Sequence, residues 1–296
     1  MSWARAFDRS RERVLETLAN RVPEGAFSEH SFRDYVSPIP NFAASLFADS
    51  TENIFVNVLQ QKAEVFAAEA LSAHSKFHHS LACTNLLSKW GALTWSLLDA
   101  YHCALFGAKA ILSSYGLSIF TVNGQSCLAD LWPELGRRNE IQKFEKAYGK
   151  RDSLVRIERT GGTLGQRDIW SGLERVCRIG KSDNTEVEGR LEKIREIIAL
   201  KPWQNRHSTL YSSDRWQWRD DIVMMQLPEK EVHARFLDGS DVSIVVELVD
   251  EMFSLLSLIS GQFESVSGGV NVEGPAWISQ ISTPVAIHQP RAVPTI

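Results

Sequence analysis

Apolar residues recur at steps of three and four along four stretches of the chain, which is the spacing of one side of an α-helix. These stretches predict helices over residues 54–81, 86–114, about 185–200 and 242–261. Gly116 follows the second stretch, where a helix ordinarily ends, and Pro202 ends the third. Four helices can bury one another's apolar sides, so we expect a mainly all-α fold, a bundle of four to five helices.

The segments around these helices set the expected domain organisation. Residues 1–50 predict an N-terminal helix and a partly extended arm, residues 51–262 the helical bundle with an insertion at about 120–185, and residues 263–296 a flexible tail rich in Gly and Pro. The glycine-rich stretch 161–165 predicts a loop without a phosphate-binding pattern. Asp238 and Gly239 fit either a hairpin turn or the start of the last helix.

Composition and charge predict a globular protein that stays inside the cell. Apolar residues make up 44% of the chain and charged residues 23%, as in ordinary globular proteins, and the net charge is -4. The N-terminus carries arginines in place of the apolar core of a signal peptide, and charges interrupt the two longest apolar stretches. The four cysteines show no metal-like spacing. We therefore expect a cytoplasmic protein with reduced thiols and no membrane contact.

Basic residues are concentrated in residues 137–178, which hold eleven Lys or Arg against six Asp or Glu. Phe144, Tyr148 and Trp170 are interleaved with them, so the segment could contact a nucleic-acid backbone and stack on bases. A solvated helix face of mixed charge is the alternative, and the commoner one. The candidate RNA-binding residues are Arg137, Arg138, Lys143, Lys146, Lys150 and Arg151.

Two histidines, His74 and His78, are four residues apart in the first predicted helix and therefore share one face. Such a pair can hold a metal, but Ser75 stands where a zinc protease has its catalytic glutamate. A third ligand would have to come from Asp99 or His102. We expect a polar helix face here, with no metal and no cofactor.

The segment after Pro202 groups a cation, an imidazole and a phenol. Arg206, His207 and Tyr211 follow at helical spacing along one side. A guanidinium can hold a phosphate, and an imidazole titrates near neutral pH and can move a proton. Together they could support metal-independent cleavage of RNA, whose 2′-hydroxyl is its own nucleophile. Spacing alone favours a packing network that pins the helix against the bundle.

Two stretches of the chain resemble the HEPN (higher eukaryote and prokaryote nucleotide-binding) family. Residues 86–119, LLSKWGALTWSLLDAYHCALFGAKAILSSYGLSI, are similar to its helix "AYYAxFxAAKALLxxxGI". The matching positions are Ala100, Tyr101, Phe106, Ala108, Lys109, Ala110 and Gly116. Arg206, His207 and Tyr211 resemble the second signature, an arginine and a polar residue followed one turn later by histidine or tyrosine.

The resemblance implies an all-α bundle that dimerises through the face with the second signature. Members include ribonuclease toxins and defence effectors, in which both subunits contribute an arginine and a histidine to one site. Tyr211 stands where these nucleases carry the histidine, so only Arg206 and the polar position of His207 carry over. A phenol, with a pKa of about 10, is a poor general base at neutral pH.

We therefore expect a homodimeric, RNA-directed, HEPN-like protein, acting as a metal-independent endoribonuclease of a prokaryotic toxin or defence system. Arg206 would steady the scissile phosphate, His207 would move the proton and Tyr211 would donate a hydrogen bond. The alternative is a non-enzymatic dimerisation or interaction module that uses the same helix face. RNA and a second copy of the chain are the expected partners, and a protein regulator remains open.

Overall fold

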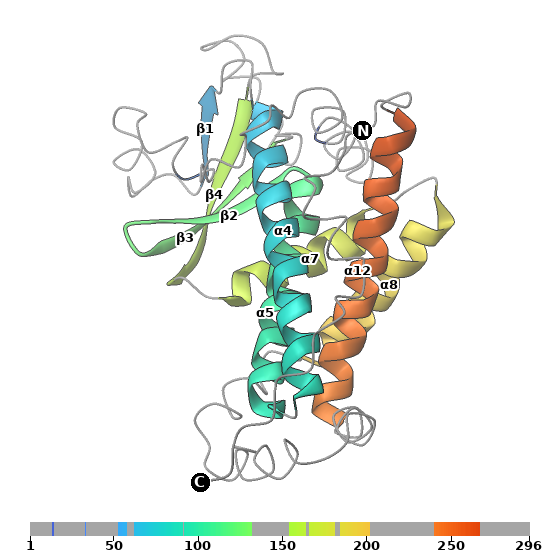
Figure 1. Cartoon of the computed structure of the whole chain (residues 1–296). Helices are drawn as coiled ribbons and strands as arrows, with labels where there is room; N and C mark the ends of the chain where they lie inside the picture. Colours follow the sequence, from blue (N-terminus) through green and yellow to red (C-terminus); the bar gives the residue numbers. More distant parts are fainter. Residues whose placement is uncertain are drawn as a thin grey trace, which may run out of the picture.

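Most of the described residues lie in five helices, which confirms the mainly helical prediction (Figure 1). The computed structural model describes residues 53–57, 62–90, 92–131, 154–163, 166–180, 184–201 and 240–266, together with Val14 and Arg33. The helices are α4 (Lys62–Lys89), α5 (Leu93–Ser114), α7 (Gln166–Ile179), α8 (Thr185–Ala199) and α12 (Ser240–Val266). The strands are β1 (Asn53–Asn57), β2 (Leu117–Val122), β3 (Gln125–Asp130) and β4 (Leu154–Thr163).

Helix α5 lies at the centre of the described fold. It packs along α4 and contacts α12, α7 and β2 (Figure 1). Ala104, Ala108 and Ile111 lie along α5 and are almost completely buried. Phe77 of α4 and Met252 of α12 belong to the same apolar cluster. The broad apolar stripe of this helix is therefore explained by neighbours on several sides.

Gly107 lets α5 approach two other helices at once. A Cβ atom at this position would lie 2.9 Å from Sδ of Met252 and 3.0 Å from the ring of Phe77. Real Cβ atoms rarely come so close to other heavy atoms, because protein interiors are already close-packed. A side chain at position 107 would therefore force the side chain of Met252 or the ring of Phe77 to shift.

A four-stranded antiparallel sheet packs beside the helices, and the hydrophobic pattern of the sequence does not predict it; β1 precedes α4, and β2, β3 and β4 follow α5 along the chain. The strand order is β1-β4-β3-β2. Gly116, with φ of 73°, ends α5 and leads directly into β2. Asn123 and Gly124 both have positive φ and connect β2 to β3, as the two-residue turn of a tight hairpin requires. Strand β2 thus begins immediately after the central helix.

Helix α7 packs between this sheet and α5. Its buried residues Ile169, Leu173 and Val176 recur at helical spacing and belong to the main apolar cluster. A Cβ atom at Gly172 would lie 3.1 Å from Ile119 of β2, so α7 approaches the sheet closely. Both β2–β4 and α7 fall in the segment 120–185 or at its edge, so the predicted insertion contains regular structure.

Several predicted boundaries are wrong. Residues 53–57 form β1, so the first predicted helix, 54–81, actually begins at Lys62 as α4. Helix α4 also continues to Lys89, beyond the predicted start of the second helix at residue 86. The stretch 161–163 ends β4 and is not a loop.

The last two predicted helices agree with the structure. Helix α8, Thr185–Ala199, matches the prediction of 185–200, and α12 begins at Ser240, which fits the helical alternative for the residues after Gly239. Helix α12 continues to Val266, a few residues into the segment that was predicted to be flexible.

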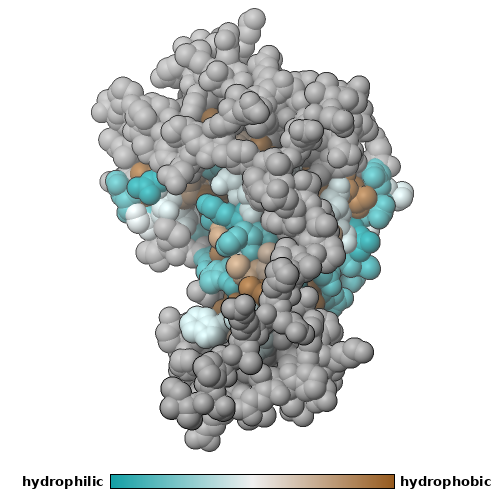
Figure 2. All heavy atoms as spheres, in the orientation of Figure 1, coloured by the Kyte–Doolittle hydropathy of each residue, from teal (hydrophilic) through white to brown (hydrophobic). Residues whose placement is uncertain are grey.

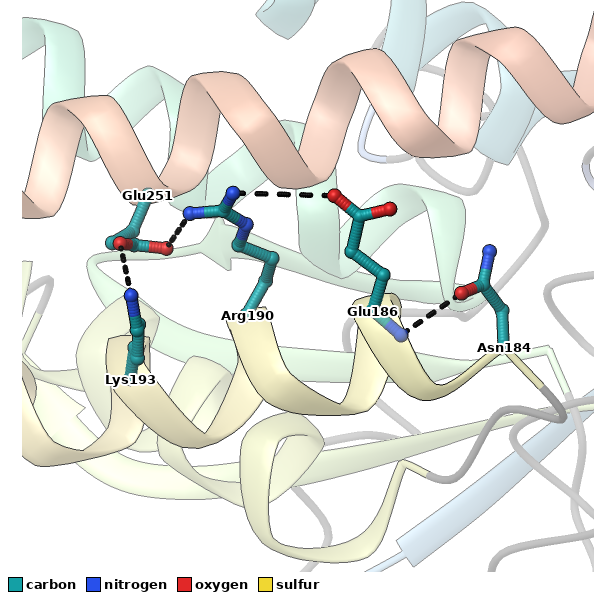
Figure 3. A network of polar contacts seen from close by, with 5 residues as sticks. All are labelled: Asn184, Glu186, Arg190, Lys193 and Glu251. Carbon is teal, nitrogen blue, oxygen red and sulfur yellow. Dashed lines mark hydrogen bonds and ion pairs between the residues drawn. The ribbon is translucent and has the colours of Figure 1, made fainter.

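A network of charged side chains joins α8 to α12 (Figure 3). The carboxylate of Glu251 accepts hydrogen bonds from Arg190 at 2.8 Å and from Lys193 at 3.3 Å. Burial acts to raise the pKa of Glu251, but these two cations hold it below its ordinary value of 4.5. Asn184 caps α8 by accepting a hydrogen bond from the backbone N–H of Glu186 at 2.9 Å. The contacts with Glu251 thus hold α8 against α12, and the cap at Asn184 defines where α8 begins.

We predict that Gly107→Val lowers the free energy of unfolding by about 1–3 kcal/mol, because the added atoms overpack the contact with Phe77 and Met252. Gly189→Val in α8 is the matched control, since nothing lies within 4 Å of a Cβ atom there. Urea denaturation measures both variants. Equal stability of the two variants would contradict the close approach of α5.

We also predict that Glu251→Gln destabilises the protein in a pH-dependent way. A carboxylate whose pKa is lowered by folding stabilises the fold above its ordinary pKa of 4.5 and loses this effect as the pH falls through its lower folded value. The urea midpoints of wild type and variant should differ most near neutral pH and converge in acid. A difference that stays constant down to the acid limit would contradict this role of the carboxylate.

Candidate functional site

The residues that the sequence analysis assigns to catalysis lie outside the described residues. These are Arg206, His207 and Tyr211. The same holds for the six candidate RNA-binding residues, Arg137, Arg138, Lys143, Lys146, Lys150 and Arg151. The structure describes the elements that flank these segments in the sequence, which are α8 and α12 for the catalytic candidates and β3 and β4 for the RNA-binding ones.

Helix α8 is the last described element before the segment that holds Arg206, His207 and Tyr211. Its residues Val187, Leu191 and Ile194 are completely or almost completely buried. After the helix ends, the backbone N–H groups of Leu200 and Lys201 donate hydrogen bonds to the carbonyl oxygens of Ile197 and Ile198. Lys201 has φ of 54°, so the chain turns away from the helix axis immediately before Pro202.

Tyr101, one of the positions that resemble the HEPN helix, is a buried link between α5 and α7. Its hydroxyl donates a hydrogen bond to Oε1 of Gln166 at 2.5 Å and accepts one from Nε1 of Trp170 at 3.4 Å. Trp170 is only 1% exposed, so the hypothesis that it stacks on bases is wrong. Its indole instead contributes to the apolar core, with its single donor satisfied.

Part of the predicted basic surplus is internal. Arg156 is 5% exposed and makes ion pairs with Asp130 at 3.3 Å and with Glu158 at 3.4 Å. Arg175 lies near the same carboxylates, and burial lowers the pKa of its guanidinium. In the described part of residues 137–178, Arg167 and Arg178 are exposed. A ligand can therefore reach fewer of these cations than the sequence count indicates.

The structure brings His74 and His78 together, as their spacing predicts. Their Nε2 atoms lie 3.2 Å apart. Among the described residues no group of three or more His, Cys, Asp or Glu side chains could hold a metal ion, so neither Asp99 nor His102 is a third ligand here.

All four cysteines of the chain are described, and each is a free thiol. Burial raises the pKa of the Cys103 thiol. It also raises the pKa of Cys127 to about 11 and that of Cys177 to about 12. Burial and the charge of Asp99 also raise the pKa of Cys83, whose Sγ lies 3.7 Å from Nε2 of His79. Because the thiolate is the nucleophilic form, none of these thiols is activated for catalysis.

The surface of the described residues is largely hydrophilic on the face shown in Figure 2, with smaller hydrophobic areas between the polar ones. The large exposed apolar side chains among them include Leu86, Trp90 and Trp95, close to the α4–α5 connection. None of the described helices combines the length and the apolar character needed to cross a bilayer.

Comparison of the chain with known proteins gives no match to a family model, to a curated protein sequence or to a solved structure. The residues and the geometry described above are therefore the basis for a functional conclusion.

Proposed function

We propose that this protein is an RNA-directed, HEPN-like homodimer that cleaves RNA without a metal ion. The observation that carries the proposal is the sequence of Arg206, His207 and Tyr211, which combines a phosphate-binding group with a group that transfers protons near neutral pH. Arg206, the first residue of this group, lies five positions after Lys201, and α8 ends shortly before, at Ala199.

The central helix and its neighbours support the proposal. In the HEPN-like stretch, Ala108 and Ala110 are buried in α5, and Gly116 ends the helix with a positive φ. The order of the two similar stretches along the chain also agrees with the family. The second stretch follows α8, which packs against α7 and α12. A rigid bundle of this kind is a suitable support for a site made of long polar side chains.

The proposed reaction uses the 2′-hydroxyl of RNA as the nucleophile. His207 takes the proton of this hydroxyl, and the oxygen attacks the adjacent phosphorus. The bond from phosphorus to the 5′-oxygen breaks, leaving a 2′,3′-cyclic phosphate on one product. The departing oxygen accepts a hydrogen bond from Tyr211 and takes up a proton from water. The hydroxide that this leaves then takes the proton from His207, so the imidazole returns to its neutral form. The guanidinium of Arg206 stabilises the charge on the phosphate oxygens through paired hydrogen bonds.

We predict that the purified protein degrades RNA in the presence of EDTA and leaves DNA of the same sequence intact, because DNA lacks the 2′-hydroxyl. Arg206→Ala should reduce the rate by at least about 100-fold, and His207→Ala by about 100-fold to 10,000-fold, which is the range that general acid–base catalysis contributes. Gel electrophoresis of a labelled RNA measures both the rate and the cyclic phosphate end.

Arg195→Ala is the matched control, because it removes an arginine of α8 whose exposed ion pair with Glu192 lies outside the basic segment 137–178. It should cleave RNA at nearly the wild-type rate, and circular dichroism should show that all three variants are folded. RNA that stays intact at high concentrations of wild-type protein would end the nuclease proposal.

We also predict that the helix face with Arg206, His207 and Tyr211 joins two copies of the chain. Light scattering should give the mass of two chains for the wild type, and Arg206→Ala or Tyr211→Phe should shift the protein towards the mass of one chain. A dimer with intact RNA would support the non-enzymatic interaction module instead. A wild-type protein with the mass of one chain would contradict a shared site.

A further inference from the structure

Two imidazoles that have no role in the proposed RNA cleavage meet on α4. His74 and His78 are one helical turn apart, and their Nε2 atoms approach to 3.2 Å. We infer that these two side chains bind one divalent transition metal ion of the zinc type through their Nε2 atoms. The inference goes beyond the proposed function, which requires no metal.

The distance between the two nitrogens fits a shared ion. Zinc–nitrogen bonds are about 2.0–2.1 Å, so two ligands at a tetrahedral angle lie about 3.3–3.4 Å apart. The observed 3.2 Å is close to this value without any movement of the helix. Two histidines at positions i and i+4 project from the same helix face, so both lone pairs can point at one ion.

Both imidazole rings are partly buried, and this burial shifts their pKa values in the same direction. Burial, and then the proximity of His78, lowers the pKa of His74 from 6.5 to about 4. Burial also lowers the pKa of His78.

Aromatic rings from two helices restrict how His78 can turn. The centroid of the Phe77 ring lies 5.5 Å from the centroid of the His78 ring, and that of the Phe253 ring in α12 lies 5.8 Å from it. Both pairs of rings meet edge to face. The ring of His74 contacts that of His78 edge to face at 4.5 Å. A ligand that is already oriented loses less conformational entropy when the ion binds.

Without an ion, the same approach is a hydrogen bond in which one Nε2–H donates to the other Nε2. To bind zinc, the donating ring moves its proton from Nε2 to Nδ1, and both Nε2 lone pairs then face the ion. This exchange of tautomers neither releases nor takes up a net proton. The pair is therefore suited to both states at neutral pH.

The remaining coordination positions are open to water or a small ligand, since the described residues contain no third His, Cys, Asp or Glu that completes the group. Imidazole nitrogen suits Zn²⁺, Ni²⁺ and Cu²⁺, whereas Mg²⁺ prefers oxygen. We therefore expect a site that binds zinc and does not bind magnesium.

Titration calorimetry with ZnCl₂ tests this inference on the full chain after EDTA has been removed by dialysis. The wild type should bind one Zn²⁺ saturably, and MgCl₂ should give no heat of binding. His74→Gln and His78→Gln should each weaken zinc binding by at least about 100-fold, because changes to outer-shell partners of a ligand already cost about 10–100-fold. Zinc should also raise the melting temperature of the wild type, but not that of His74→Gln or His78→Gln.

The matched control is His79→Gln, on the same helix. His79 pairs with Cys83, whose raised pKa leaves the thiol protonated and a poor metal ligand. This variant should bind zinc within about twofold of the wild type. Loss of binding in His79→Gln, or retention in His74→Gln, would overturn the assignment, as would the absence of saturable binding in the wild type.

Two further readouts keep the test decisive. If a glutamine variant does not fold by circular dichroism, the imidazole NMR signals of the wild type replace it. Zinc should then shift the signals of two histidines, and a shift of none or of His79 would refute the site. RNA cleavage is measured in EDTA, so a failure of the zinc site and a failure of the nuclease give separate results.

Discussion

The close contact of three helices at Gly107 is the constraint on which the described fold depends. Helix α5 meets Phe77 of α4 and Met252 of α12 at this point, where a Cβ atom would lie 3.0 Å and 2.9 Å from their side chains. Because α5 is held from several sides, the elements that follow it take defined positions. Gly116 directs the chain into the sheet, and Tyr101 reaches across to α7. Helix α8 is in turn attached to α12 through Glu251.

The sequence was sufficient to predict helices whose apolar residues face one side, and insufficient where both sides are buried. Helix α8 is predicted almost to the residue because its polar face is exposed and its apolar face is regular. In β2 and β3 almost every position is buried or partly buried, so the alternation that marks a strand is lost. The pair Asn123 and Gly124 was the available signal for the hairpin.

The chemistry of individual side chains depended on contacts between distant segments. Arg156 and Trp170 add to a basic and aromatic pattern in the sequence, but in the fold they contact Asp130 and Tyr101 in the interior. The shared face of His74 and His78 follows from helical spacing alone, whereas their burial and the contact with Phe253 depend on how α12 packs. Spacing thus identifies candidate groups, and packing determines which of them are available for function.

The central functional claim is that Arg206 and His207 of two chains form one crevice that holds a phosphate. The most direct measurement is a crystal structure of the homodimer with a non-cleavable RNA dinucleotide. We predict that the guanidinium groups and imidazoles of both copies converge on a single phosphate within hydrogen-bonding distance. Side chains of Arg206 and His207 that point apart into solvent, with no phosphate between them, would contradict the claim.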